Sequence, residues 1–131
     1  MDKSDVVKPI TTIVTGSNYN LWVQGMKNFL ISRKLWQIVT GDITKPSKEN
    51  IETDSKFADR LADWDSKNHQ IITWICNTSV PSIHIQFTDY ETAKEVWDFL
   101  ANRYRTTGLA HYYQLWTALH HLKAKIQTIR E

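Results

Sequence analysis

Five histidines and one cysteine are the residues of this chain best suited to binding a metal ion. His120 and His121 are adjacent, so on a helix their side chains point about 100° apart and do not easily share one ion. His69 and Cys76 lie about two helical turns apart, which is too far for ligands on adjacent turns. No C-x-x-C or H-E-x-x-H pattern occurs. We therefore predict no metal site and no cofactor.

Catalytic chemistry would need a nucleophile beside a base, or paired carboxylates in an apolar segment. Cys76 lies within the most apolar stretch of the chain, where a thiol tends to be inert. Acidic residues gather at 54–65 and 89–98, and a solvated helix surface explains both groups. The chain has no glycine-rich loop to hold a phosphate. We predict no enzyme, no catalytic residue and no small-molecule substrate.

Basic residues are the remaining candidates for a binding function, and they are scattered along the chain. The net charge is only +2, which does not by itself imply a nucleic-acid or membrane partner. Arg103 and Arg105, and Lys123 with Lys125, could make weak phosphate contacts. Charges near helix ends more often interact with the helix dipole. A weak nucleic-acid-binding helical domain therefore stays open as an alternative function.

Trp116 differs from the other tryptophans, whose spacing places them in the core. It lies off the row formed by Leu115 and Leu119, and the polar residues Gln114 and Thr117 flank it. The side chain either packs against another helix or anchors an interface, and the sequence leaves both open. Because buried aromatic residues dominate interface energies, we treat Trp116 as a possible assembly contact.

The stretch from Phe57 to Ser79 must organise these residues, because its apolar spacing is that of one helical face. Asp59, Asp63 and Lys67 lie on other faces of its first half. In its second half, apolar residues flank the stripe on both sides. A helix that is apolar nearly all round is surrounded by other helices. We predict that this segment is the central helix of a single core.

Other helices are predicted before and after this stretch. A helix over residues 19–33 should follow Ser17 or Asn18, either of which can cap its first turn. Residues 35–39 suit either a short helix or an extended segment, and residues 42–53 suit an exposed loop. Thr53 or Asp54 should then cap the Phe57–Ser79 segment.

The C-terminal half contains further start and stop signals. Pro81 suits the first position of a one-turn helix at 81–85. Thr88 and Glu91 have the spacing of a capping box for a helix over residues 90–104. Gly108 should break the chain, and a last helix should run from about residue 109 to the end.

Composition and helix pattern together predict one all-α domain, a compact orthogonal bundle of about five helices. Hydrophobic residues make up 41% and charged residues 23%, as in globular proteins, and four glycines are few for a β-sandwich. One cysteine excludes an internal disulfide framework, and no apolar run approaches bilayer length, so we expect an intracellular protein without a membrane partner. The predicted core residues are Trp22, Phe29, Trp64, Ile71, Trp74, Ile75, Trp97, Leu100, Leu115 and Leu119.

Four blocks follow one another along the chain: Thr15–Trp22, Leu35–Gly41, Trp64 with Ile71–Ile75, and Thr92–Leu100 with Arg103-Tyr104. In this order and at these separations they resemble the N-terminal capsid region of Gag polyproteins from Copia-type LTR retrotransposons, especially plant ones. Each block alone is an aromatic residue in a helical context, so the resemblance rests on all four together. It covers nearly the whole chain beyond residue 12.

The resemblance implies a capsid N-terminal domain that self-assembles into cytoplasmic virus-like particles around element RNA, with the nucleus as a second possible location. On this basis we expect a flexible arm at residues 1–12 and a capsid-like helical domain at residues 13–131, truncated before a second capsid domain. Self-association should be weak for this segment, and RNA is a possible partner of the full-length protein. Neither a zinc knuckle nor a protease motif is present here. A domesticated Gag-derived adaptor or protein-binding module stays open as an alternative.

Overall fold

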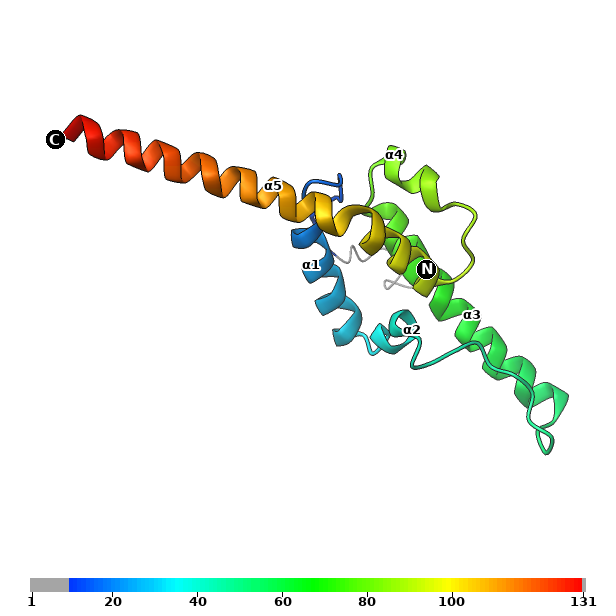
Figure 1. The fold of residues 1–131 in the computed structure, drawn as a ribbon. Helices are drawn as coiled ribbons and strands as arrows, with labels where there is room; N and C mark the ends of the chain where they lie inside the picture. Colours follow the sequence, from blue (N-terminus) through cyan, green and yellow to red (C-terminus); the bar gives the residue numbers. More distant parts are fainter. Residues whose placement is uncertain (1–9, 131) are drawn as a thin grey trace.

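The computed structural model describes residues 10–130, and it confirms the predicted all-α class (Figure 1). The described part of the chain contains an isolated β-bridge, between Val14 and Ser79, and otherwise helices joined by loops. The helices are α1 (Tyr19–Ser32), α2 (Trp36–Thr40), α3 (Asp54–Asn77), α4 (Pro81–His84), the 3₁₀ turn η2 (Ile85–Phe87) and α5 (Ala93–Arg130). Residues 1–9 of the expected arm lie outside the described residues.

Helix α3 begins where the sequence places a cap. The Thr53 hydroxyl accepts a hydrogen bond from the Lys56 amide at 3.2 Å, which satisfies one of the free N–H groups of the first turn. The helix ends at Asn77, and α4 follows with Pro81 in its first turn, as predicted. One face of α3 is buried along Trp64, Asn68, Ile71, Trp74 and Ile75.

The ends of α1 are set by loop and backbone geometry. Asn18 occupies the N-cap position, but its side chain accepts from the Thr15 amide and donates to the Ile13 carbonyl, both at 2.8 Å. It therefore holds the preceding loop and does not cap the helix by a side-chain bond, contrary to the prediction. At the other end, Lys34 has a φ of +62° and its amide donates to the Ile31 carbonyl at 3.0 Å. This left-handed residue ends the helix.

Helix α5 differs from the prediction at its start. It begins at Ala93, and the capping pair is Thr92 with Glu95: the Thr92 hydroxyl accepts from the Glu95 amide at 3.1 Å and donates to its carboxylate at 2.8 Å. Thr88, which was predicted to cap a helix at residue 90, instead donates its hydroxyl to the Ile85 carbonyl.

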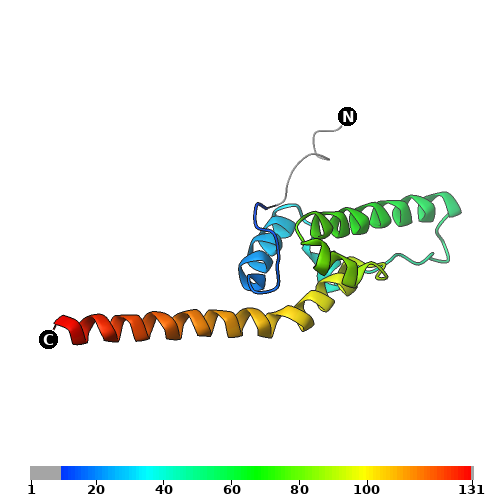
Figure 2. The same cartoon turned by 90° about the horizontal axis from the view of Figure 1, so that it is seen from above.

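Helix α5 also continues where a break was predicted. It runs through Gly108 to Arg130 as one helix of 38 residues, about 57 Å long, so the two expected helices are one. A single glycine costs only about 1 kcal/mol inside a helix, and the residues on both sides favour helix. The second half of α5 projects away from the body of the molecule in both views (Figures 1 and 2).

The first turns of α5 form the centre of the core, because α1, α2 and α3 all contact this helix. Ala93, Val96, Trp97 and Leu100 are buried there. The prediction that α3 is the central helix is therefore wrong. The N-terminal half of α3 extends beyond the body, opposite the projecting half of α5 (Figure 2).

The predicted core residues fall into a buried group and an exposed group. Trp22, Trp64, Ile71, Trp74, Ile75, Trp97 and Leu100 are buried, and Phe29 is partly buried against them. Leu115 and Leu119 are 53% and 65% exposed, so their assignment to the core of this chain is wrong. They lie on the projecting half of α5, which no other described helix covers (Figure 1).

Candidate interaction surface

The histidine, cysteine and acidic side chains that the structure describes are spread over the molecule. Among the described residues, no group of three or more His, Cys, Asp or Glu side chains could hold a metal ion. Burial raises the pKa of the Cys76 thiol, which disfavours the reactive thiolate. His69 Nδ1 lies 2.8 Å from the Asp65 carbonyl oxygen, one turn earlier on α3.

Asn68 joins α3 to the start of α5, a role that the sequence analysis did not identify. Its side-chain oxygen accepts a hydrogen bond from the Ala93 amide at 2.7 Å, and its Nδ2 donates to the Glu91 carbonyl at 2.9 Å. Asn68 is 1% exposed, and its bond to the Ala93 amide forms away from water. The available signal was an amide side chain on the otherwise apolar face of α3.

Thr78 has a similar joining role at the other end of α3. Its hydroxyl accepts from the Trp22 indole at 3.0 Å and donates to the Trp74 carbonyl at 2.8 Å. The Thr78 carbonyl accepts from the Val14 amide at 2.7 Å, so one residue connects α3 with α1 and with the segment before it.

Two hollows lie beside Trp64, with volumes of about 140 and 230 Å³. The indole Nε1 of Trp64 is buried and has no hydrogen-bond partner among the residues that the structure describes. Lys94 lines the first hollow, and Arg60 and Lys67 line the second. These three cations pair with carboxylates of this chain, and Lys45 and Lys34 also line the first and second hollow respectively.

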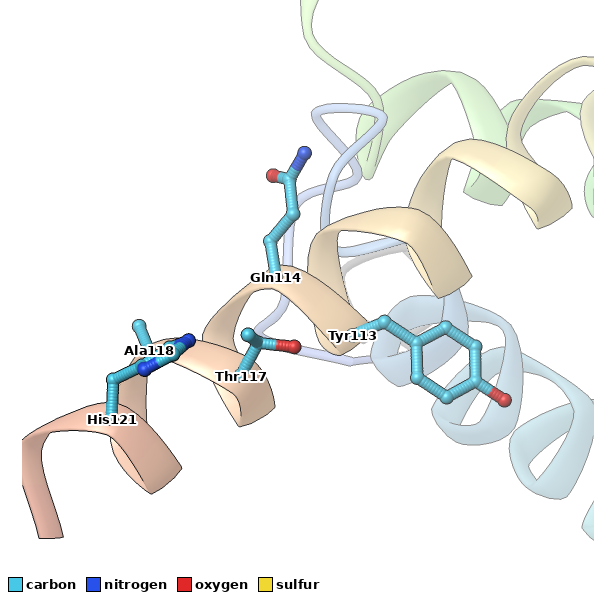
Figure 3. A pocket seen from close by; sticks show the side chains of 5 residues that line it. All are labelled: Tyr113, Gln114, Thr117, Ala118 and His121. Carbon is cyan, nitrogen blue, oxygen red and sulfur yellow. The ribbon is translucent and has the colours of Figure 1, made fainter. Parts of the chain in front are cut away.

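The projecting half of α5 carries the largest concentration of exposed apolar side chains. Trp116 is 52% exposed, so within this chain it does not pack into the core. The exposed row comprises Leu115, Leu119, Leu122, Ile126 and Ile129. A hollow of about 410 Å³ also lies on this half, and it is lined by side chains of α5 alone (Figure 3). A hollow formed by one helix is a surface groove, so this half presents an open surface and not an enclosed site.

The charge of this surface is one-sided. Residues 106–130 contain no Asp or Glu. Lys123 and Lys125 are exposed there, and the Trp116 ring lies 3.9 Å from that of His120. Earlier on the same helix, Lys94 is paired with Asp98. The projecting half of α5 therefore combines apolar and cationic side chains without a neutralising carboxylate of its own.

Within the part of the chain that the structure describes, no helix has both the length and the apolar character to cross a bilayer.

Comparison with known proteins gives one match. A family model described as the gag-polypeptide of LTR copia-type matches residues 26–131, which is most of the chain. The match includes three of the four sequence blocks noted above and leaves Thr15–Trp22 outside. No curated protein and no solved structure matches.

Proposed function

Because the chain belongs to the family of copia-type LTR retrotransposon Gag polypeptides, we propose that it is a structural Gag segment that self-associates to build particles around element RNA. The observation that carries this proposal is the exposed apolar row on the projecting half of α5. Large exposed apolar patches on folded proteins typically mark interaction sites. The role is structural, and it involves no catalytic step.

Particle assembly favours contacts that are individually weak, because subunits must be able to dissociate and correct errors. Many such contacts add through multivalency once a shell closes. The row on α5 suits this requirement, because it is one narrow stripe on one helix. Residues 13–131 form the capsid-like domain of this proposal, with the packed body as its unit and the preceding residues as an arm. We place this assembly in the cytoplasm.

Sedimentation velocity over a range of concentrations tests the proposal. We expect the wild-type chain to be monomeric when dilute and to associate reversibly when concentrated. Trp116→Ala should weaken that association, because Trp116 is an exposed aromatic side chain beside the row. Ile51→Ala is the matched control, since Ile51 is 96% exposed in the loop before α3, far from the row.

The outcomes separate the candidate functions. Association that Trp116→Ala weakens and Ile51→Ala leaves unchanged supports a structural Gag role. A wild-type chain that stays monomeric at high concentration, with and without RNA, contradicts self-assembly. That result would favour a Gag-derived adaptor that uses the same surface for a different protein.

A further inference from the structure

The exposed row on α5 has the spacing of a coiled-coil seam. Leu115, Leu119, Leu122, Ile126 and Ile129 follow one another at alternating steps of four and three. This is the a/d pattern of a heptad repeat, which is narrower than the stripe of a helix packed onto a globular body. All of these side chains are exposed, from 45% at Ile126 to 84% at Ile129. The row thus has the geometry to pair with one further helix.

On each side of the row runs a flank, a line of residues that would border the second helix. Trp116 and Lys123 are seven residues apart on one flank, and Ala118 and Lys125 are seven apart on the other. Each flank therefore begins with an uncharged residue and continues with a lysine. All the Lys and Arg residues of this half lie at position 123 or beyond, and it has no carboxylate to neutralise them.

We propose that the partner of this row is a second copy of the same chain, docked antiparallel, with Leu119 of each copy facing Leu122 of the other. This inference deepens the proposed self-association and rests on it. The register also places Leu115 opposite Ile126. Each pair of facing residues is therefore apolar, and each pair occurs twice in the dimer, as a twofold-symmetric interface requires.

The charges decide the direction of the second helix. In a parallel pair, the two copies of Lys125 would lie at the same height, and Lys125 would approach the position of Arg130 in the other copy. In the antiparallel pair the two Lys125 positions are about 13 Å apart along the axis. This exceeds the Debye length of about 10 Å at 0.1 M salt, so their repulsion is largely screened. The two Lys123 positions, on facing flanks, are about 7.5 Å apart along the axis and keep one partly screened repulsion, whereas a parallel pair would bring Lys125 close to Arg130 twice.

The same arrangement gives each flank a favourable neighbour. When the helices run antiparallel, like flanks face each other, so Lys123 of one copy approaches Trp116 of the other and Lys125 approaches Ala118. The Trp116 and Lys123 positions differ in height by about 3 Å, within reach of a cation–π contact. The row spans little more than two heptads, so the pair should be weak on its own.

Cross-linking between differently labelled copies tests the direction. In a Cys76→Ser background, one chain carries Leu115→Cys and a second, size-tagged chain carries Ile126→Cys. A bis-maleimide shorter than about 16 Å should join the two variants when they are mixed. It should not join either variant to itself, because like positions then lie about 16 Å apart along the helix axis.

Charge and apolar variants test the surface in sedimentation equilibrium. Leu119→Asp should weaken the dimer at least tenfold, whereas Gln127→Asp, which adds the same charge on the outer face, should change it less than about threefold. Lys125→Glu should also change it less than threefold, since the residue faces Ala118. In a parallel pair the same substitution would remove a repulsion and strengthen the dimer.

Four results would overturn this inference. Self-cross-linking of either single-cysteine variant, or a strengthened Lys125→Glu dimer, shows a parallel pair. Association that Leu119→Asp leaves intact shows that another surface is used, and the proposed Gag role then survives without this interface. A wild-type chain that does not associate defeats both the interface and the proposed function.

Discussion

Trp97 lies against two other tryptophan rings at the start of α5. Its ring centroid is 5.6 Å from that of Trp22 and 5.1 Å from that of Trp36, and the side chain is 9% exposed. Its position on an apolar helical stripe predicted burial but did not predict these ring partners. They come from α1 and α2, far away in the sequence.

Trp97→Ala should therefore lower the free energy of unfolding by about 3–5 kcal/mol, because it empties a large aromatic site. Trp116→Ala removes the same side chain from an exposed position and should cost less than about 0.5 kcal/mol. Denaturant melts of the two variants make the comparison. A loss below about 1 kcal/mol at Trp97 would contradict the core described here.

Glu52 joins the loop before α3 to that helix through a two-point contact with Arg60. Glu52 Oε2 accepts from Arg60 Nε at 2.5 Å and Oε1 accepts from Nη2 at 2.7 Å, while the same guanidinium donates to the Ser47 carbonyl at 3.1 Å. The hydrogen bond from Arg60 lowers the pKa of the Glu52 carboxyl to about 2. A lowered pKa means that folding favours the charged form.

The pair should therefore stabilise the fold fully above pH 4.5 and progressively less as the pH falls toward 2. Glu52→Gln removes the titrating group. We expect the thermal midpoint of the wild type to exceed that of the variant at neutral pH, and the difference to shrink between pH 4.5 and 2. A difference that stays constant across this window would show that the Glu52 contact with Arg60 does not contribute through its charge.

At the scale of helices, Asn68 makes the start of α5 depend on α3. Asn68→Ala would leave the Ala93 amide buried without this partner, which costs about 1–3 kcal/mol, and would also remove the bond to the Glu91 carbonyl. Asn77→Ala is the control, because Asn77 is exposed at the end of α3. Chemical unfolding should show a loss of at least about 1 kcal/mol for Asn68→Ala and little change for the control.

The sequence predicted helix ends best where one residue imposes the local geometry. Thr53 caps α3 and Pro81 begins α4, both at the predicted positions. The start of α5 was misplaced because Thr88 and Thr92 each have a glutamate three residues later. The contact that accompanies the observed start, from Asn68 to the Ala93 amide, spans 25 residues, and local spacing does not reveal it.

The exposed row on α5 shows a second limit of sequence patterns. Its spacing correctly indicated a helix and an apolar face. The same spacing occurs in a helix that packs on its own chain and in a helix whose apolar face is exposed. Leu115 and Leu119 were therefore assigned to the wrong environment. Trp116 was identified as a candidate because it lies off the row, but its exposure depends on where α5 leaves the body.

For the whole molecule, the charge distribution limits RNA binding. With a net charge of +2, few phosphates can be neutralised at once, so affinity for single-stranded RNA should be weak and should be lost by about 0.2 M salt. Replacing Lys123 and Lys125 by Gln should reduce the slope of log affinity against log salt by about 0.7 for each lysine that contacts a phosphate. Lys48→Gln, whose lysine pairs with Asp54, should leave that slope unchanged.

Tight binding by this chain at about 0.2 M salt would contradict that expectation and would favour a nucleic-acid-binding domain instead. Filter binding across a salt series measures both quantities. The same titration with concentrated protein would also show whether RNA promotes association.

The projecting half of α5 has a dynamic consequence, because a helix without packed neighbours is only marginally stable in water. Its backbone amides from residue 113 onward should exchange with deuterium rapidly in dilute protein, while those near Leu100 should stay protected. Concentrating the protein should slow exchange along residues 113–129 without changing it at the core. The surface that joins two copies would then become fully helical only on contact, and assembly would complete the folding of each subunit.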